Sequence, residues 1–270
     1  ITIEHRLRDV PEMNYKINGE DGVPKGELMV RGPQIFPRYF RNEKATREAF
    51  DKDGFFHTGD ICKIVPKDDN KLYVIDRIKN FFKLSQGEYI SPEKIETVYL
   101  SACPMVQQAF IYGNSLKNYL VGVIGIDLDN FKKSVLNGTL DFKKLGGGNF
   151  NYNNNNNEKN LKKLIRLVSR DSRGGEKKIL ELINESYFIK KSLVVFFNSQ
   201  VEELSKQMNK KLLQNFEKIH NVKIAINPLT LEDDLVTPTL KIRRNNCGIF
   251  FKPVLDELYA EGSLIKNGKL

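Results

Sequence analysis

The segment from Asp76 to Glu96 constrains the fold more than any other part of this sequence. An apolar run, Leu72–Ile75, precedes a charged turn, and Gly87 then supplies a position where the backbone can turn sharply or approach a ligand. Ser91 and Pro92 follow as a helix N-cap and a first helical residue, ahead of an apolar face at helical spacing. The segment therefore predicts a boundary between two folded units that is crossed by a charged connection.

The composition indicates a folded chain with room for one large domain or two smaller ones. It has 270 residues, of which 40% are hydrophobic. No apolar run reaches the roughly 18 residues of a membrane-spanning helix, and the three cysteines are too far apart for a zinc or redox motif. The chain starts at Ile1 without an initiator Met or an apolar leader. We therefore expect a fragment of a longer protein.

The basic charge is concentrated in one segment. The net charge is +9, and residues 130–178 contain 12 Lys or Arg against 4 Asp or Glu, so the rest of the chain is nearly neutral. No basic motif interleaved with aromatic residues appears. We therefore expect no nucleic-acid partner.

The same segment interrupts the pattern of the folded chain. Gly146–Gly148 cannot hold a helix, and Asn149–Asn160 contains 8 asparagines. We predict a flexible, low-complexity insertion at about 130–178. A contact of the basic part, Lys159–Lys178, with a membrane surface is an open alternative.

The other patterns predict an α+β fold. Short strands with polar turns are expected before Ile75, with one short helix at Asn42–Phe50. The later elements expected are a hairpin (Met105–Gly113 with Tyr119–Asp127), helices between Lys178 and Leu213, a strand at Val222–Ile226 and a last helix at Gly248–Tyr259.

Three ordered motifs carry a resemblance to a known superfamily. They are His57-Thr58-Gly59-Asp60, the stretch from Asp76-Arg77 through Gly87-Glu88-Tyr89-Ile90 to Pro92-Glu93-Lys94-Ile95-Glu96, and Val236-Thr237-Pro238-Thr239-Leu240-Lys241. Together they resemble the adenylate-forming superfamily of acyl- and aryl-CoA synthetases, adenylation domains and firefly luciferase. The long-chain fatty acyl-CoA synthetase branch is the most similar, because Thr239-Leu240 replaces the Ser-Gly that precedes the lysine in many relatives.

The resemblance implies a division of the chain. Residues 1–76 would be the β-rich end of a large ATP-binding domain, its terminal β-barrel part. Residues 77–270 would form a small mobile α+β domain. Lys79 would occupy the hinge between them.

The resemblance also assigns nucleotide-binding residues. Asp60 would bind the two ribose hydroxyls of ATP, because one carboxylate offers two acceptor oxygens to two neighbouring donors. Arg77 would contact the ribose or the phosphates, and Lys241 would be the lysine of the adenylation step. Spacing alone favours roles without a function in binding or catalysis, because Asp60 would cap a turn and Lys241 would lie in a surface loop.

Two residues are assigned to the second step. Lys83 matches a lysine that faces the active centre during thioester formation, and Gly87 matches a glycine beside the pantetheine arm of coenzyme A. From spacing alone, Lys79 and Lys83 would form a solvated basic turn.

The function implied is that of an ATP-dependent long-chain fatty acid–CoA ligase, in the cytoplasm or peripheral on a membrane such as the endoplasmic reticulum. Its substrates would be a fatty acid, ATP and coenzyme A. The phosphate loop, the Mg²⁺ ligand and the acyl pocket lie upstream in relatives, so we expect no metal site here and no adenylation by these 270 residues alone. A synthetase for another acid and a catalytically silent paralogue that binds acyl-CoA or nucleotide remain alternatives.

Overall fold

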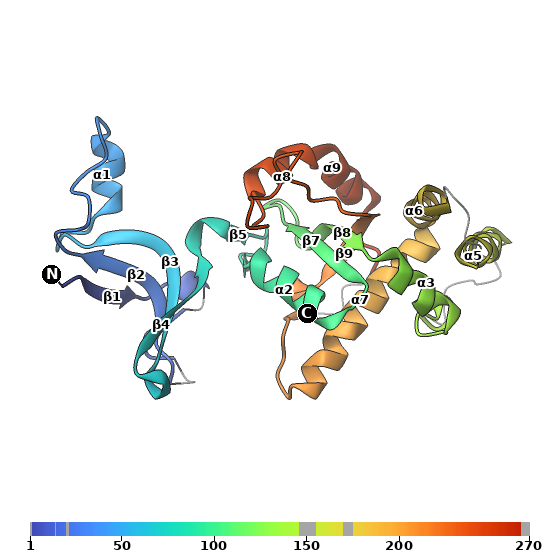
Figure 1. Ribbon diagram of the computed structural model, residues 1–270, viewed down its shortest axis with the longest axis horizontal. Coiled ribbons are helices and arrows are strands. Elements are labelled where there is room, and N and C mark those ends of the chain that lie inside the picture. The colour runs from blue at the N-terminus through green and yellow to red at the C-terminus, as the bar shows by residue number, and fades with distance from the viewer. Residues whose placement is uncertain (1, 14, 20–21, 146–154, 170–174, 266–270) are drawn as a thin grey trace. The chain divides into compact units, whose positions relative to one another are not determined.

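The computed structural model describes residues 2–13, 15–19, 22–145, 155–169 and 175–265. The chain divides into two compact units (Figure 1). Unit 1 comprises Ile1–Phe82 with Tyr89–Ser91, and unit 2 comprises Lys83–Glu88 with Pro92–Leu270. The chain crosses between the units after Phe82, Glu88 and Ser91, so residues 77–82 belong to unit 1 and not to unit 2.

Unit 1 is built on a four-stranded sheet in the order β1-β2-β3-β4. Each neighbouring pair is antiparallel. The elements are β1 (Glu4–Arg8), β2 (Lys25–Arg31), α1 (Glu43–Ala49), β3 (Phe56–Val65), β4 (Lys71–Arg77) and three short 3₁₀ helices (Pro11–Met13, Pro66–Asp68, Ile78–Asn80). The expected short helix is present, and Asn42 caps it by accepting a hydrogen bond from the Ala45 amide.

The sheet of unit 1 is open, whereas the resemblance implies the terminal part of a β-barrel. Within the described residues it runs from β1 to β4 without closing, so this part of the chain holds an open sheet and no closed barrel. A barrel needs its first and last strands to pair, and the described strands of unit 1 do not supply that pairing.

Unit 2 has a three-stranded sheet with β8 at its centre. β7 (Val106–Tyr112) pairs antiparallel with β8 (Leu120–Ile126), which confirms the predicted hairpin. β9 (Ile219–Ala225) lies parallel to β8 on the other side. Every residue of β8 is buried, as expected for a strand covered on both faces.

Helices cover both faces of this sheet. α2 (Pro92–Ala102) and α7 (Tyr187–Gln207) lie on one face, and α8 (Arg244–Phe250) and α9 (Lys252–Glu261) lie on the other (Figure 1). Phe110, Val121 and Val123 pack with Phe251 and Leu255 in the core under α8 and α9.

A buried polar network joins the first face to the sheet. The Tyr99 hydroxyl donates to Oδ1 of Asn198 and accepts from the Ile219 amide at 3.0 Å. Nδ2 of Asn198 donates to the Ile219 carbonyl, also at 3.0 Å. Three elements far apart in sequence are thereby fixed by satisfied polar groups in the core.

The predicted insertion is more ordered than expected. The described parts form α3 (Leu128–Leu136), α4 (Phe142–Leu145), α5 (Asn155–Val168) and the start of α6 (Gly175–Glu185), whose later residues lie in the helical region expected after Lys178. Phe131, Leu161 and Leu164 are buried. The prediction of a flexible, solvated segment is therefore wrong for these parts, because apolar residues at helical spacing override the Asn-rich composition. Gly146–Gly148 and the first half of the Asn run, Asn149–Asn154, lie outside the described residues.

His220 on β9 is buried beside Ser263 and Tyr119. Its exposure is 5%, its Nδ1 lies 2.8 Å from the Ser263 hydroxyl, and its ring stacks on Tyr119. Desolvation, with a smaller contribution from the charge of Lys218, lowers the pKa of His220 to about 4.

We predict that unit 2 loses stability in acid through His220. The unfolded chain takes up the proton near pH 6.5, whereas the folded chain does so only near pH 4. The contribution is therefore complete above pH 6.5 and is lost as the pH falls, at up to about 1.4 kcal/mol per pH unit. Denaturant unfolding followed by far-UV circular dichroism measures this slope. His220→Gln should flatten it between pH 6.5 and 4, and equal slopes in both proteins would contradict the assignment.

Candidate functional site

Asp60 and Arg77 are direct partners across two neighbouring strands. They face each other in the antiparallel register of β3 and β4. Nε of Arg77 donates to Oδ1 of Asp60 at 2.6 Å, and the side chains are 53% and 27% exposed, respectively. Because the register fixes both Cβ positions, the backbone itself holds a carboxylate and a guanidinium together at an accessible place on unit 1.

A buried carboxylate, Glu27 on β2, supports the segment that carries Asp60. Glu27 is 2% exposed and accepts hydrogen bonds from Nε of Arg8 at 2.9 Å and from the Gly59 amide at 3.2 Å. Its Oε2 lies 3.0 Å from Nδ1 of His57. A charge buried in this way needs several partners, and here two of them belong to the motif that ends at Asp60.

The motif itself is irregular where it passes Glu27. The pairing of β2 with β3 shifts between Glu27 and Met29, as at a β-bulge. Gly59 has φ = 72°, in the region that favours glycine. The Thr58 hydroxyl donates to the Leu28 carbonyl at 2.7 Å and accepts from the Asp60 amide at 3.1 Å. These contacts fix the direction in which Asp60 leaves the strand.

Lys83 and Gly87 lie together on a tight turn of unit 2. The Gly87 amide donates to the Leu84 carbonyl at 3.0 Å, and the Ser85 amide donates to the Lys117 carbonyl at 3.0 Å. Gly87 has φ = 96°, and a Cβ placed on it would lie 3.8 Å from Cε of Lys83. The glycine therefore presents open backbone beside the exposed Lys83 side chain.

Lys241 projects from a closed loop between β9 and α8. Val236 and Ile242 form an isolated antiparallel bridge at the base of the loop. The Thr237 amide donates to the Lys241 carbonyl at 2.8 Å, and the Lys241 amide donates to the Thr237 hydroxyl at 3.0 Å. Leu240, which is 73% exposed, takes a positive φ of 61° at the tip. The bridge and these hydrogen bonds therefore fix the base of the loop, while Lys241 itself is exposed to solvent.

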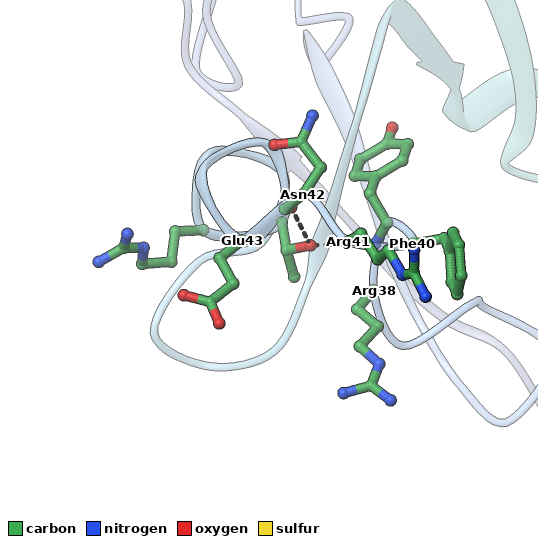
Figure 2. A pocket seen from close by; sticks show the side chains of 8 residues that line it. Arg38, Phe40, Arg41, Asn42 and Glu43 are labelled. Carbon is green, nitrogen blue, oxygen red and sulfur yellow. Dashed lines mark hydrogen bonds between the residues drawn. The ribbon is translucent and has the colours of Figure 1, made fainter.

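A hollow of about 370 Å³ lies beside this loop within unit 2. Glu93, Glu96, Gln108, Lys241 and Arg244 are among the residues that line it. A second hollow, of about 460 Å³, opens on unit 1 around Arg38, Phe40 and Arg41 (Figure 2). None of the predicted site residues lines the second hollow.

The described residues contain no group of three or more His, Cys, Asp or Glu that could hold a metal ion. The three cysteines, Cys62, Cys103 and Cys247, are buried and free, and burial raises the pKa of each thiol to about 11. A thiol with so high a pKa is a poor nucleophile.

The predicted residues thus form two groups. Asp60 and Arg77 belong to unit 1, whereas Lys83, Gly87 and Lys241 belong to unit 2. Lys79 lies in the 3₁₀ turn Ile78–Asn80, and its side chain lies outside the described residues.

Sequence reasoning assigned no role to Glu27, Glu96 or Arg244. The only signal for Glu27 is a carboxylate inside the strand β2 (Lys25–Arg31).

Relatives with known names match nearly the whole chain. Long chain acyl-CoA synthetase 7, a peroxisomal protein of Arabidopsis thaliana, is 34% identical over 258 residues, which are 96% of this chain and 30% of that protein. Long-chain-fatty-acid–CoA ligase 5 of Mus musculus is 32% identical over 94% of this chain and 30% of its own length. The chain is a homologue of the long-chain acyl-CoA synthetases. It spans about a third of the length of the curated relatives that it matches.

A solved structure supports the same relationship. The adenylation domain of a carboxylic acid reductase from Segniliparus rugosus, determined with AMP and a co-purified carboxylic acid, is similar with a TM-score of 0.59 and 25% identity. The match covers 96% of this chain and 31% of that one. No protein-family model matches the chain. The mixed fold of this acyl-CoA synthetase homologue therefore matches part of an adenylate-forming domain.

We predict that Glu27→Gln loosens the motif around Asp60. The substitution keeps the size of the side chain but leaves Arg8 and the Gly59 amide facing a neutral group. We expect the free energy of unfolding to fall by about 1–3 kcal/mol and hydrogen exchange at the Gly59 and Asp60 amides to accelerate. Glu4→Gln is the matched control, because Glu4 pairs with Arg31 on the same sheet with its side chain 60% exposed. Equal effects of the two substitutions would contradict the role given to Glu27.

Proposed function

We propose that this chain is the C-terminal part of an ATP-dependent long-chain fatty acid–CoA ligase. The enzyme would convert a fatty acid, ATP and coenzyme A into acyl-CoA, AMP and pyrophosphate through an acyl-adenylate. The observation that carries the proposal is the Asp60–Arg77 pair, held at 2.6 Å by strand register in a chain homologous to long-chain acyl-CoA synthetases.

In the first step, a carboxylate oxygen of the fatty acid attacks the α-phosphorus of ATP, and the bond to pyrophosphate breaks. Asp60 would accept hydrogen bonds from the ribose hydroxyls, and Arg77 would contact the ribose or phosphates. Lys241 would place its ammonium where negative charge accumulates between carboxylate and phosphate. Removing one such preorganised group lowers a rate on the order of 10²–10³-fold.

In the second step, the sulfur of coenzyme A attacks the acyl carbonyl. The bond from the carbonyl carbon to the phosphate oxygen breaks, AMP leaves, and the thiol proton is released. Rotation at Lys79 would exchange Lys241 for Lys83 and Gly87 at the reacting centre. Gly87 supports this proposal because its φ of 96° favours glycine and places backbone without a side chain beside Lys83.

Mg²⁺ would enter as the companion of ATP. The resemblance to acyl-CoA synthetases implies that its protein ligand lies in the part of the enzyme upstream of this chain. The phosphate loop and the acyl pocket are expected there too. These 270 residues alone should therefore release no AMP in response to a fatty acid.

The second candidate function is the activation of a carboxylic acid other than a long-chain fatty acid. The similar carboxylic acid reductase domain was determined with a carboxylic acid, which keeps another acid as the second candidate. Competition between acids of different chain length, followed by AMP release, separates the two. A catalytically silent paralogue would bind nucleotide or acyl-CoA without releasing AMP.

We propose a cytoplasmic enzyme with peripheral attachment to a membrane such as the endoplasmic reticulum. Among the described residues, no helix is both long and apolar enough to cross a bilayer. Lys159, Lys162 and Lys163 on α5 would supply the basic contact with anionic lipid.

We predict that Asp60→Asn in the full-length enzyme raises the KM for ATP by about tenfold to a hundredfold, because a hydrogen bond to a charged group is worth about 1.5–3 kcal/mol. AMP release with palmitate, ATP, Mg²⁺ and coenzyme A measures it. Asp53→Asn is the control, since Asp53 is an exposed carboxylate of the same unit that pairs with Arg6. An unchanged KM would contradict the role of Asp60, and no AMP release from the wild-type enzyme would overturn the proposed function.

A further inference from the structure

A buried ion pair joins α2 to the start of α8 in unit 2. Nη2 and Nη1 of Arg244 donate to the two carboxylate oxygens of Glu96 at 2.5 and 3.1 Å. The side chains are 16% and 6% exposed. The two residues are 148 positions apart in the sequence. A bidentate arginine–carboxylate pair fixes direction as well as distance, so the start of α8 is held in one orientation against α2.

Glu96 also binds the sheet. Its Oε1 accepts the Ile111 amide of β7 at 2.8 Å. Burial raises the pKa of Glu96, while the charge and hydrogen bonds of Arg244 oppose that rise. One carboxylate thereby links α2, β7 and α8.

The arrangement is poorly suited to stability alone. Nε of Arg244 is buried without a hydrogen-bond partner among the described residues, and such a donor costs about 1–3 kcal/mol. Arg244 also places a positive charge in the first turn of α8, against the helix dipole. A buried ion pair is in general weak support for stability. Because the pair carries these costs, we interpret its role as fixing the orientation of α8 against α2.

The geometry acts on the loop that carries Lys241. Arg244 follows Lys241 by three residues, and both line the same hollow with Glu96. The Arg243 amide donates to the Leu235 carbonyl at 2.8 Å, which closes the base of the loop just before Arg244. Leu235 is 1% exposed within the core under α8 and α9. The base is thus anchored by packing, and Glu96 sets its direction.

We infer that Glu96 and Arg244 are positioning residues for Lys241, which hold its loop in the direction needed for acyl-adenylate formation. This inference rests on the proposed function of Lys241. It implies an effect on the first half-reaction only, because Lys83 and Gly87 lie on a different turn, tied to Lys117 and Asn118.

The test measures the two half-reactions separately in the full-length enzyme under single-turnover conditions. Pyrophosphate release from palmitate and ATP without coenzyme A reports the first. AMP release from synthetic palmitoyl-adenylate and coenzyme A reports the second. Glu96→Gln and Arg244→Lys should slow the first by about tenfold to a hundredfold, as expected for a misplaced catalytic group. The rate of the second half-reaction should stay within about twofold of the wild-type rate, which also shows that the variants fold.

Lys94→Gln is the matched control. Lys94 lies on the same helix and pairs with Glu217 at 2.6 Å, without lining the hollow beside Lys241. Both of its half-reactions should remain near the wild-type rates. Equal losses in both half-reactions of Glu96→Gln, or an unchanged first one, would overturn the inference. Lys241→Ala tests the proposed role of Lys241 separately from the inferred role of Glu96 and Arg244. An unchanged first half-reaction in that variant would overturn the assignment of Lys241 itself.

Discussion

All connections between the two units of the chain fall in one short segment, between Phe82 and Pro92. Both sides of this short crossing are anchored. On the side of unit 1, Ile90 is fully buried and the Ser91 hydroxyl donates to the buried Asp76 carboxylate. On the side of unit 2, Leu84 is buried and the Ser85 amide bonds to the Lys117 carbonyl. Each unit can therefore keep its own candidate residues in place independently of the other.

Both units use a buried carboxylate to hold a segment that carries candidate site residues. In unit 1, Glu27 binds the Gly59 amide and Arg8. In unit 2, Glu96 binds the Ile111 amide and Arg244. A buried charge tolerates few alternative arrangements, because each lost partner leaves a group that water cannot reach. The short motifs around Asp60 and Lys241 gain their direction from these two acids, although neither acid belongs to the reacting set proposed here.

Local signals in the sequence account for much of the fold. Three of these signals act over only a few residues: Asn42, Pro92 and the turn near Asn114. The elements that they predict, which are the short helix α1, α2 and the β7–β8 hairpin, are all present. The adjacency of Asp60 and Arg77 could not be predicted from spacing, because it depends on the register of β3 and β4. The Glu96–Arg244 pair joins residues 148 positions apart. The helices between 128 and 168 do not follow from this reading of the sequence, because glycine and asparagine content outweighs the periodicity of Leu161 and Leu164.

Under the proposed function, unit 2 would serve two half-reactions with two different lysines. Lys241→Ala and Lys83→Ala in the full-length enzyme test this division, with the rates of acyl-adenylate formation and of thioester formation determined in single turnovers. We expect Lys241→Ala to lose adenylate formation by about 10²–10³-fold and to keep thioester formation. Lys83→Ala should instead keep adenylate formation and lose thioester formation. Parallel losses of both half-reactions in each variant would show that the two lysines do not have separate roles.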